Sequence, residues 1–246
     1  MDMESQNSGY FFSGQETASV NVTKTFMANV FIWMTVAMAV TAITAYLFAS
    51  SADLIGNLVN LQTGKMTGLG WVVTFAPFGF VLLMSMGFQR LSPAIMTLLF
   101  LAFAVLMGMS LSFILLIYTA ASVYKTFLVT AGMFGVMAFL GYTTKTDLTK
   151  FGSIMMMGLF GMIIAMLVNM FMHSSTMEYI ISVAGVLIFT GLTAYDVQKL
   201  KRIGAGTGMA AGDANVRKLS ILGALTLYLD FINLFLFLLR FLGDRK

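Results

Sequence analysis

Two aspartates in strongly apolar surroundings are the residues of this chain best suited to chemistry. Asp230 lies near the middle of the apolar run 222–243, and Asp196 lies in the segment GLTAYDVQKLKR. A carboxylate at the centre of a membrane helix costs about 2.5–3.5 kcal/mol, so it normally faces a protein interior or a water-filled cavity. Two carboxyl groups in contact titrate as a coupled pair that can hold one proton between them. The two residues are therefore candidates for a pH-dependent charge at one site inside a membrane.

Polar residues on the same helical faces would support such a pair. On a helix, Thr226, Asp230 and Asn233 share one face, because side chains three or four positions apart are neighbours. A narrow polar stripe on an otherwise apolar helix is expected to face inward. Asn169, in another apolar segment, and Tyr195 are further candidates for supporting polar contacts. For Asn169 an interhelical hydrogen bond without functional meaning is the structural alternative.

Asp196 also has a purely structural interpretation. It lies close to the end of its apolar segment, so it can be solvated or paired with Lys199 or Lys201 and do nothing else. At about 1.5 Å per residue, Asp230 lies roughly 15 Å, and Asp196 about 5 Å, from the ends of their apolar segments. The sequence leaves a gap of about 10 Å between the two acids. A tilt, a water-filled funnel or a longer last helix would have to close it.

The elements that must position these acids are membrane helices. The chain has 246 residues, of which 59% are hydrophobic and 10% charged, and its mean hydropathy is +0.91. These values exclude an ordinary soluble surface and indicate a polytopic membrane protein in contact with a lipid bilayer. Apolar segments of about 20 residues, bounded by polar residues, Gly or Pro, predict membrane spans. They cover residues 26–49, 69–88, 92–119, 123–142, 152–172, 177–197 and 219–242.

We therefore predict an all-α membrane protein with seven transmembrane helices in one bundle. Residues 24–246 form a single domain, since no repeat or apolar-to-polar shift divides them, and the polar residues 1–23 form a disordered tail. Residues 199–218 form a basic, Gly-rich loop. Small residues four positions apart, at 131 and 135 and at 161 and 165, predict close helix packing.

The distribution of Lys and Arg predicts the orientation of the bundle. With the N-terminus inside, nine basic residues lie on the inner side and five on the outer side, three of those five in the C-terminal tail. Positive residues in short loops favour the cytoplasmic side. An N-in, C-out protein is the economical solution for seven spans.

Composition also excludes several classes of function. The chain contains no Cys, so disulfides, thiolate metal sites and cysteine nucleophiles are excluded. A pI near 9.3 would suggest nucleic acid in a soluble protein, but here the basic residues orient helices, and we expect no nucleic-acid partner. With a single His and no Cys, the 22 Met residues are core filling rather than a soft-metal path. We expect no bound cofactor.

Two long motifs resemble the Bax inhibitor-1 family of transmembrane proteins, in its bacterial inner-membrane branch. They are GLTAYDVQKLK at 191–201 and SILGALTLYLDFINLFLFLLRFLG at 220–243, and the likeness extends through 117–148. The resemblance implies a seven-helix bundle with the last helix at its centre. It also implies that Asp196 and Asp230 form a pH-sensitive pair gating a calcium leak. An arginine near the end of the second helix engages that pair in the family, and Arg90 is the corresponding residue.

These observations lead to one main hypothesis and two rivals. The main hypothesis is a non-enzymatic, pH-sensitive leak channel for Ca²⁺ or another cation, in which Asp196 and Asp230 provide the oxygen ligands. The first rival is a non-conducting regulator of other membrane proteins, such as a membrane protease. The second is an intramembrane aspartyl protease, which also uses two acids on consecutive helices. Leu229 and Phe231 argue against a protease, because such enzymes place Gly around the second acid.

Overall fold

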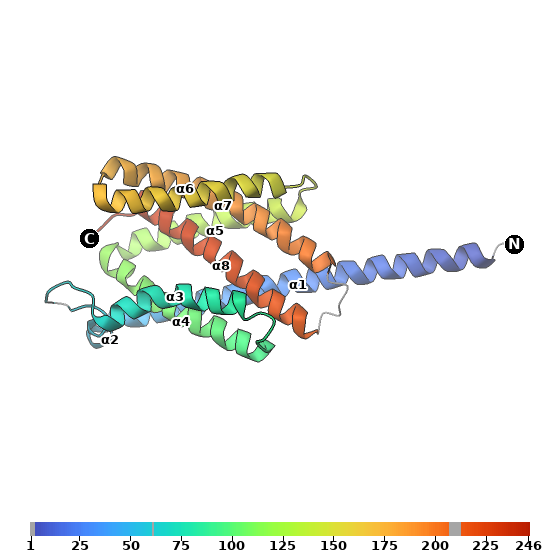
Figure 1. The fold of residues 1–246 in the computed structure, drawn as a ribbon, viewed down its shortest axis with the longest axis horizontal. Helices are drawn as coiled ribbons and strands as arrows, with labels where there is room; N and C mark the ends of the chain where they lie inside the picture. The colour runs from blue at the N-terminus through green and yellow to red at the C-terminus, as the bar shows by residue number, and fades with distance from the viewer. Residues whose placement is uncertain (1–2, 61, 207–212) are drawn as a thin grey trace.

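The computed structural model describes the backbone of residues 3–60, 62–206 and 213–246, and side chains from residue 22 onward. Apart from two isolated bridges, the described residues form helices joined by short connections (Figure 1). The helices are α1 (Met3–Ser50), α2 (Ala52–Gly56), α3 (Gly68–Met86), α4 (Pro93–Ile117), α5 (Ala120–Thr143), α6 (Thr149–Met172), α7 (Ser175–Gly206) and α8 (Ala214–Leu242).

Seven of these helices are long and apolar enough to cross a membrane, which confirms the predicted number. They are α3 to α8 and the part of α1 from Val22 to Ser50. The short helix α2, which follows α1, was not predicted. The division into a tail at 1–23 and a domain at 24–246 stays a prediction, as does the N-in, C-out orientation.

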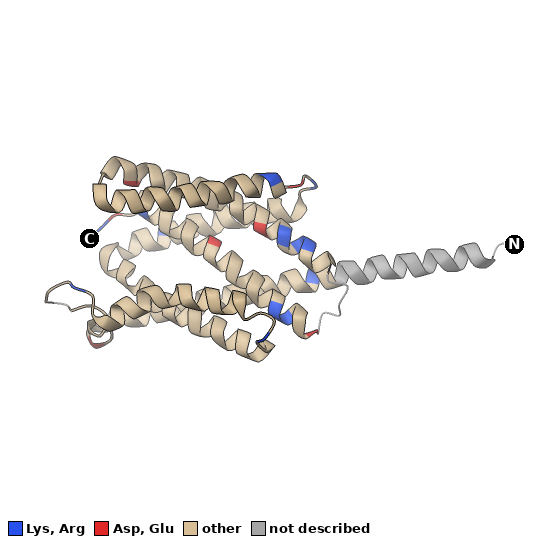
Figure 2. Ribbon diagram, in the orientation of Figure 1, with Lys and Arg blue, Asp and Glu red and all other residues tan. Residues whose placement is uncertain are grey.

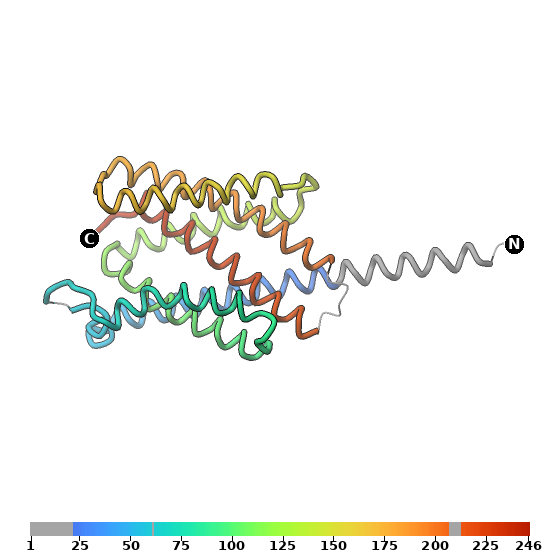
Figure 3. The backbone as a smooth tube through the Cα atoms, in the orientation of Figure 1, coloured from blue at the N-terminus to red at the C-terminus, as the bar shows by residue number. Residues whose placement is uncertain are grey.

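Helix α8 lies at the centre of the bundle, as the resemblance implied. In its most apolar stretch 72% of the residues are buried, against 56% in α7 and at most 28% in any other span. Helix α8 packs against α7, α1, α5 and α4, and touches α3 more lightly. It runs obliquely between α1, α3 and α4 on one side and α5, α6 and α7 on the other (Figures 1 and 3). A helix surrounded in this way can carry polar groups away from lipid.

Side-chain caps explain where several helices begin. Ser92 accepts a hydrogen bond from the backbone of Ile95 and is followed by Pro93 in the first turn, as predicted. Thr119 caps α5 in the same way. Asp213 caps α8 through the N–H of Asn215. Each cap satisfies an N–H group that has no partner within its own helix.

The predicted loop at 199–218 is wrong over most of its length. Helix α7 continues to Gly206, and α8 already begins at Ala214. Residues 207–212 lie outside the described residues. The basic side chains that had suggested a loop stand on helical turns that extend the spans beyond their apolar segments. Length and hydropathy locate the apolar part of a helix but not its polar extension.

The predicted small-residue contacts are also wrong. A Cβ atom at Gly135 or at Gly161 would meet no atom of another residue within 4 Å. Other glycines make the close approaches, among them Gly108 of α4, where a Cβ would lie 2.6 Å from the carbonyl oxygen of Thr41 on α1. Gly141 and Gly152 make two more, close to Asp196.

Basic residues gather at one end of the bundle, which we call the basic end. It is the end at which α7 finishes and α8 begins (Figure 2). Here the buried Lys218 donates a hydrogen bond to the carbonyl oxygen of Phe88, just beyond α3. This contact joins the start of α8 to the end of α3. The asymmetry agrees with the Lys and Arg count behind the predicted orientation.

A buried chain of hydrogen bonds joins α1, α4 and α8 on the face of α8 that points away from α7. The hydroxyl of Thr41 on α1 donates to the carbonyl oxygen of Ala104 on α4 at 2.9 Å, and it lies 2.8 Å from the hydroxyl of Tyr228 on α8. Since Thr41 has one hydroxyl proton and gives it to Ala104, Tyr228 is the donor of the second bond. Tyr228 is fully buried.

This chain of bonds yields a test of the packing of α1 against α8. Thr41→Val leaves the Tyr228 hydroxyl buried without an acceptor and should cost about 1–3 kcal/mol of unfolding free energy. Tyr228→Phe leaves the bond from Thr41 to Ala104 intact and should cost less, about 0.6 kcal/mol. The double variant should cost less than the sum of the two. Unfolding in detergent micelles measures all three, and strictly additive costs would contradict the assignment.

Candidate functional site

Asp196 and Asp230 meet in the interior of the bundle. Asp196 lies on α7 and Asp230 on α8, and their carboxyl groups are within hydrogen-bonding contact of each other. Asp230 is 5% exposed, whereas Asp196 is only partly buried. The structure therefore brings together the two acids that the sequence left about 10 Å apart. Of the two, Asp196 is the one that solvent can reach.

One oxygen of the pair has no protein donor. Oδ2 of Asp230 is buried and accepts no hydrogen bond from any other group among the described residues. A buried polar atom without a partner costs about 1–3 kcal/mol. The groups that can satisfy this oxygen are a proton carried by the facing carboxyl, a water molecule or a cation.

The packing register of α7 against α8 closes the predicted gap. The side chain of Leu200 on α7 lies against Gly223 on α8, and the ring of Phe237 on α8 lies against Gly185 on α7. Leu200 is therefore level with residue 223 of α8, and not with residue 219, where the apolar segment begins. That shift of four residues, about 6 Å along the helix, accounts for most of the gap. Side-chain length covers the rest.

Two glycines hold the turn of α7 that carries Asp196. A Cβ atom on Gly141 of α5 would fall on the backbone carbonyl of Ala194, and one on Gly152 of α6 would fall on the ring of Tyr195. Helices α5 and α6 therefore approach the two residues that precede Asp196 as closely as their backbones allow. This contact fixes the position of Asp196 from the side opposite α8.

The family assignment follows from comparison with known proteins. The family described as "Inhibitor of apoptosis-promoting Bax1" matches residues 23–246. The chain belongs to this family. It is 46% identical over 223 residues to the inner membrane protein YbhL of Escherichia coli K12, which covers 91% of this chain and 93% of that protein. The resemblance in the two motifs is thereby confirmed.

Two further relatives are described only as uncharacterized proteins. An uncharacterized protein of Rickettsia prowazekii, RP147, is 43% identical over 221 residues, which is 90% of each chain. An uncharacterized protein of Borreliella burgdorferi is 41% identical over 233 residues, covering 94% of this chain and 97% of that one. The names of these two relatives state no function.

The structure does not bring Arg90 to the pair. Arg90 is exposed in the turn after α3, two residues beyond Phe88, whose carbonyl accepts the bond from Lys218. Lys218 lies twelve positions before Asp230, which is about 18 Å along α8. Arg90 would have to move inward with the end of α3 to reach either carboxyl, so its role in gating stays a prediction.

The predicted supporting residues make local contacts instead. The amide of Asn233 donates to the carbonyl oxygen of Leu229 at 2.8 Å, within its own helix. The side-chain oxygen of Asn169 accepts from the backbone of Ser174 and closes the end of α6, which packs on α7 and not on α8. The ring of Tyr195 packs on α6 at Gly152. None of these side chains is hydrogen-bonded to the acids in the described part of the chain.

The two basic residues near Asp196, Lys199 and Lys201, make different contacts. The ammonium group of Lys199, one turn away, attracts the Asp196 carboxylate electrostatically. Lys201 instead donates to the carbonyl oxygen of Tyr142 at 2.8 Å and lies over the Tyr142 ring. Of the two pairing partners considered for Asp196, only Lys199 acts on it.

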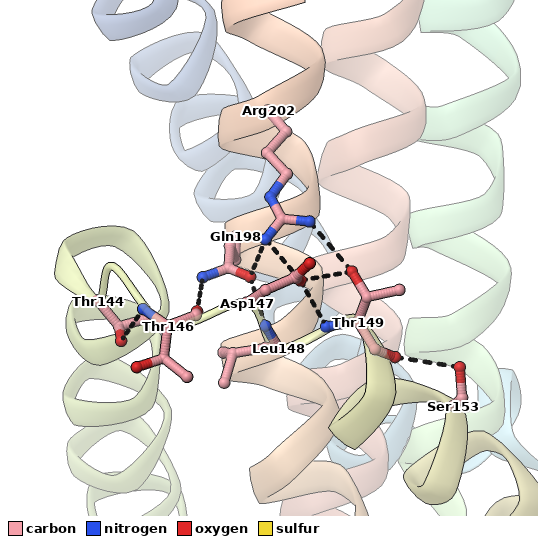
Figure 4. Close-up of polar contacts among 8 residues, drawn as sticks. All are labelled: Thr144, Thr146, Asp147, Leu148, Thr149, Ser153, Gln198 and Arg202. Atoms are coloured by element: carbon pink, nitrogen blue, oxygen red, sulfur yellow. Dashed lines mark hydrogen bonds and ion pairs between the residues drawn. The ribbon is translucent and has the colours of Figure 1, made fainter.

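Sequence reasoning missed a polar network beside the pair (Figure 4). The buried side chain of Gln198 accepts from the backbone N–H of Leu148 at 2.9 Å and donates to the carbonyl of Thr146 at 2.8 Å. Arg202 forms an ion pair with Asp147 at 2.7 Å. These contacts tie the α5–α6 connection to α7 within two turns of Asp196. Gln198 comes directly after the predicted apolar segment 177–197. The sequence could have indicated the network only if the helix had been extended past that segment.

Two carboxyl groups are few for a site that binds a metal ion tightly. Among the described residues no group of three or more His, Cys, Asp or Glu side chains lies together. A hard cation at Asp196 and Asp230 would therefore complete its shell with carbonyl oxygens or water. Such a site binds weakly and releases its ion readily.

The glycine contacts generate a matched pair of variants on one helix. Gly141→Ala places a methyl group against the backbone of Ala194, which has no flexible end to move, and should destabilise the protein by about 1–3 kcal/mol. Gly135→Ala, in open space six residues earlier, should be neutral or stabilising, because Ala is the better helix former by about 1 kcal/mol. Thermal unfolding in detergent compares them. Equal stability of the two variants would show that α5 does not position α7 in this way.

Proposed function

We propose that this chain is a pH-sensitive leak channel for Ca²⁺ or a similar cation, gated by protonation of Asp196 and Asp230. The observation that supports this most is the contact between two carboxyl groups inside a bundle of seven membrane helices. By its likeness to YbhL, the chain is a multi-pass protein of a bacterial inner membrane. In such a place a pair of acids without a cationic partner in contact needs a proton or a metal cation.

Charge explains how the pair responds to pH. When both carboxyls are ionised, two negative charges about 4 Å apart repel by about 4 kcal/mol at an effective dielectric constant of 20. A divalent cation relieves this repulsion and finds oxygen ligands. When the pair holds a proton, the repulsion and most of the attraction for a cation are gone. Flux should therefore rise as the pair loses its protons, that is, with rising pH.

A cavity on the α3 side of α8 supports access to the pair from the basic end, and neither carboxyl group lines it. It has a volume of about 460 Å³ and lies between α3 and α8, with Ser85 and Gln89 on one wall and Thr226 and Leu229 on the other. Thr226 is one turn from Asp230, and Leu229 is adjacent to it. Because α3 touches α8 only lightly, this wall is the one that can move most easily.

An apolar layer closes the path beyond the pair. Phe231, next to Asp230, is buried with Phe127 and Phe134 of α5 edge-on to its ring, both at 5.5 Å between ring centroids. The next turn of α8 brings the fully buried Leu234. A cation that leaves water cannot cross such a layer. We infer that this is the closed conformation of the proposed channel, and that conduction would require α8 and α5 to separate at these rings.

One feature of the structure favours the rival role of a non-conducting regulator. A groove of about 570 Å³ lies between α1 and α5, and the small residues Ala131, Gly135 and Ala138 line its α5 wall. Small residues permit close approach of a further helix. No comparable feature supports a protease, because α8 is an unbroken helix through Asp230, with Leu229 and Phe231 beside it.

The channel hypothesis predicts a specific loss in two variants. Asp196→Asn and Asp230→Asn should each lower Ca²⁺ flux at neutral pH at least about tenfold, equivalent to about 1.4 kcal/mol, and should flatten its pH dependence. Each removes one of the two charges and ends the coupled titration. Flux into proteoliposomes loaded with a Ca²⁺ indicator, measured over a pH series, tests this. Variants that match the unmodified protein at every pH would exclude the mechanism, and no flux at all would favour the regulator.

Asp147 provides the matched control among the acids. Hydrogen bonds from the Thr149 hydroxyl and then from Arg202 hold the pKa of Asp147 well below its ordinary value. Since the folded pKa is lowered, the contribution of Asp147 to stability is present above its unfolded pKa of about 3.9 and is lost only in stronger acid. Its charge is constant where flux should change. Asp147→Asn should therefore leave the midpoint of the flux profile in place, and a shifted midpoint would assign the pH response to the α5–α6 connection.

A further inference from the structure

A second polar pocket lies at the basic end, outside the aspartate pair and the proposed cation path. It has a volume of about 280 Å³ and opens between the start of α6 and the end of α7. Its lining is unusually polar and basic for the edge of a membrane protein: Thr149, Tyr195, Gln198, Lys199, Arg202 and Ile203.

Lys199 is the basic residue of this pocket whose ammonium group has no direct partner among the described residues. Its ammonium group lies 5.9 Å from the centroid of the Tyr195 ring. Within the described part of the chain it forms no ion pair and donates no hydrogen bond, although an ammonium group has three N–H donors. It acts on Asp196 only through its field. An anion in the pocket would give this group direct partners.

Arg202 and the start of α6 add to the positive potential. Hydrogen bonds from Arg202 to Asp147, Gln198 and Thr149 occupy three of its five N–H donors. Asp147 forms an ion pair with Arg202, whereas Lys199 has only the longer-range attraction of Asp196. At the start of α6 the backbone N–H of Thr149 donates to Asp147, so the helix already holds one carboxylate there.

The position of the pocket indicates where its anion comes from. Helix α6 is the most peripheral span, with 11% of its apolar stretch buried, and it packs mainly on α7. Its first two turns carry Phe151 and Ile154, which are 41% and 55% exposed. A molecule with a phosphate in the pocket could lay acyl chains along this face. Basic pockets between membrane helices at the cytoplasmic side bind anionic headgroups in this manner.

We propose that the pocket formed by Lys199, Arg202 and Thr149 binds a phosphate group, supplied by the headgroup of an anionic phospholipid in the leaflet at the basic end. The phosphate oxygens accept hydrogen bonds from the Lys199 ammonium and from the free N–H groups of Arg202. The lipid tails lie against the exposed face of α6. This binding site does not depend on conduction by the channel.

The test measures lipid retention by the full chain. Delipidated protein in a neutral detergent is titrated with phosphatidylglycerol or with phosphatidylcholine, and bound lipid is counted by native mass spectrometry. Lys199→Gln should weaken binding of phosphatidylglycerol about fivefold, the factor that corresponds to about 1 kcal/mol per basic residue at an anionic surface. Lys199→Arg should retain it. Binding of phosphatidylcholine should be weaker and indifferent to both variants.

Matched controls separate the alternatives. Lys145→Gln removes an exposed charge at the same end of the bundle but outside the pocket, and should leave binding unchanged. An equal loss in the Lys145 and Lys199 variants would reduce the effect to general surface charge and overturn the proposal. A third titration uses inorganic phosphate as competitor. If it binds as tightly as the lipid, and with the same dependence on Lys199, the site is one for free phosphate, and the lipid assignment is wrong.

Discussion

The contact between the carboxyl groups of Asp196 and Asp230 is the constraint on which the rest of the structure depends. Two acids can meet in the middle of a membrane only if lipid is kept from both, and the bundle achieves this by surrounding α8 with five other helices. They also have to lie at the same depth. That depth is set by the register of Leu200 on Gly223 and of Phe237 on Gly185. Because a Cβ at either glycine would displace the facing side chain, these positions carry no larger residue.

The arrangement around the pair is asymmetric, and the asymmetry explains how a charged site is compatible with a sealed membrane. Towards the basic end lie a partly exposed Asp196 and a cavity that reaches Thr226. Towards the other end lie the rings of Phe127, Phe134 and Phe231. On the face of α8 away from α7, the chain of bonds from Tyr228 through Thr41 to Ala104 holds α8 against α1 and α4. In the proposed channel, ions and protons exchange with the basic end while the aromatic layer keeps the other side dry.

The sequence predicted the spans because the membrane imposes a simple rule of length and polarity, and it predicted the start of α4 because Ser92 and Pro93 act locally. It failed where the deciding contact is between helices. Gly135 and Gly141 lie on the same helix, and nothing in their neighbours along the chain tells that only Gly141 meets another backbone. The contact between the two acids depends likewise on a register that hydropathy does not encode. The sequence did not predict the polar ends of α7 and α8. Residues such as Lys199 and Asn215 lie on helical turns outside the apolar segments, where hydropathy does not indicate a helix.

One turn of α7 contributes to the aspartate pair, to the contact with the α5–α6 connection and to the basic pocket. Successive residues of a helix point about 100° apart, so residues that follow each other closely face different neighbours. Asp196 therefore faces α8, Gln198 reaches the α5–α6 connection, and Lys199 lines the basic pocket. Gly141 and Gly152 let α5 and α6 pack closely against this turn. If the proposed gating separates the two acids by a rotation of α7, the same rotation would pull on the connection and move the Lys199 ammonium. The charge of the pair would then be coupled to the occupant of the proposed phosphate pocket.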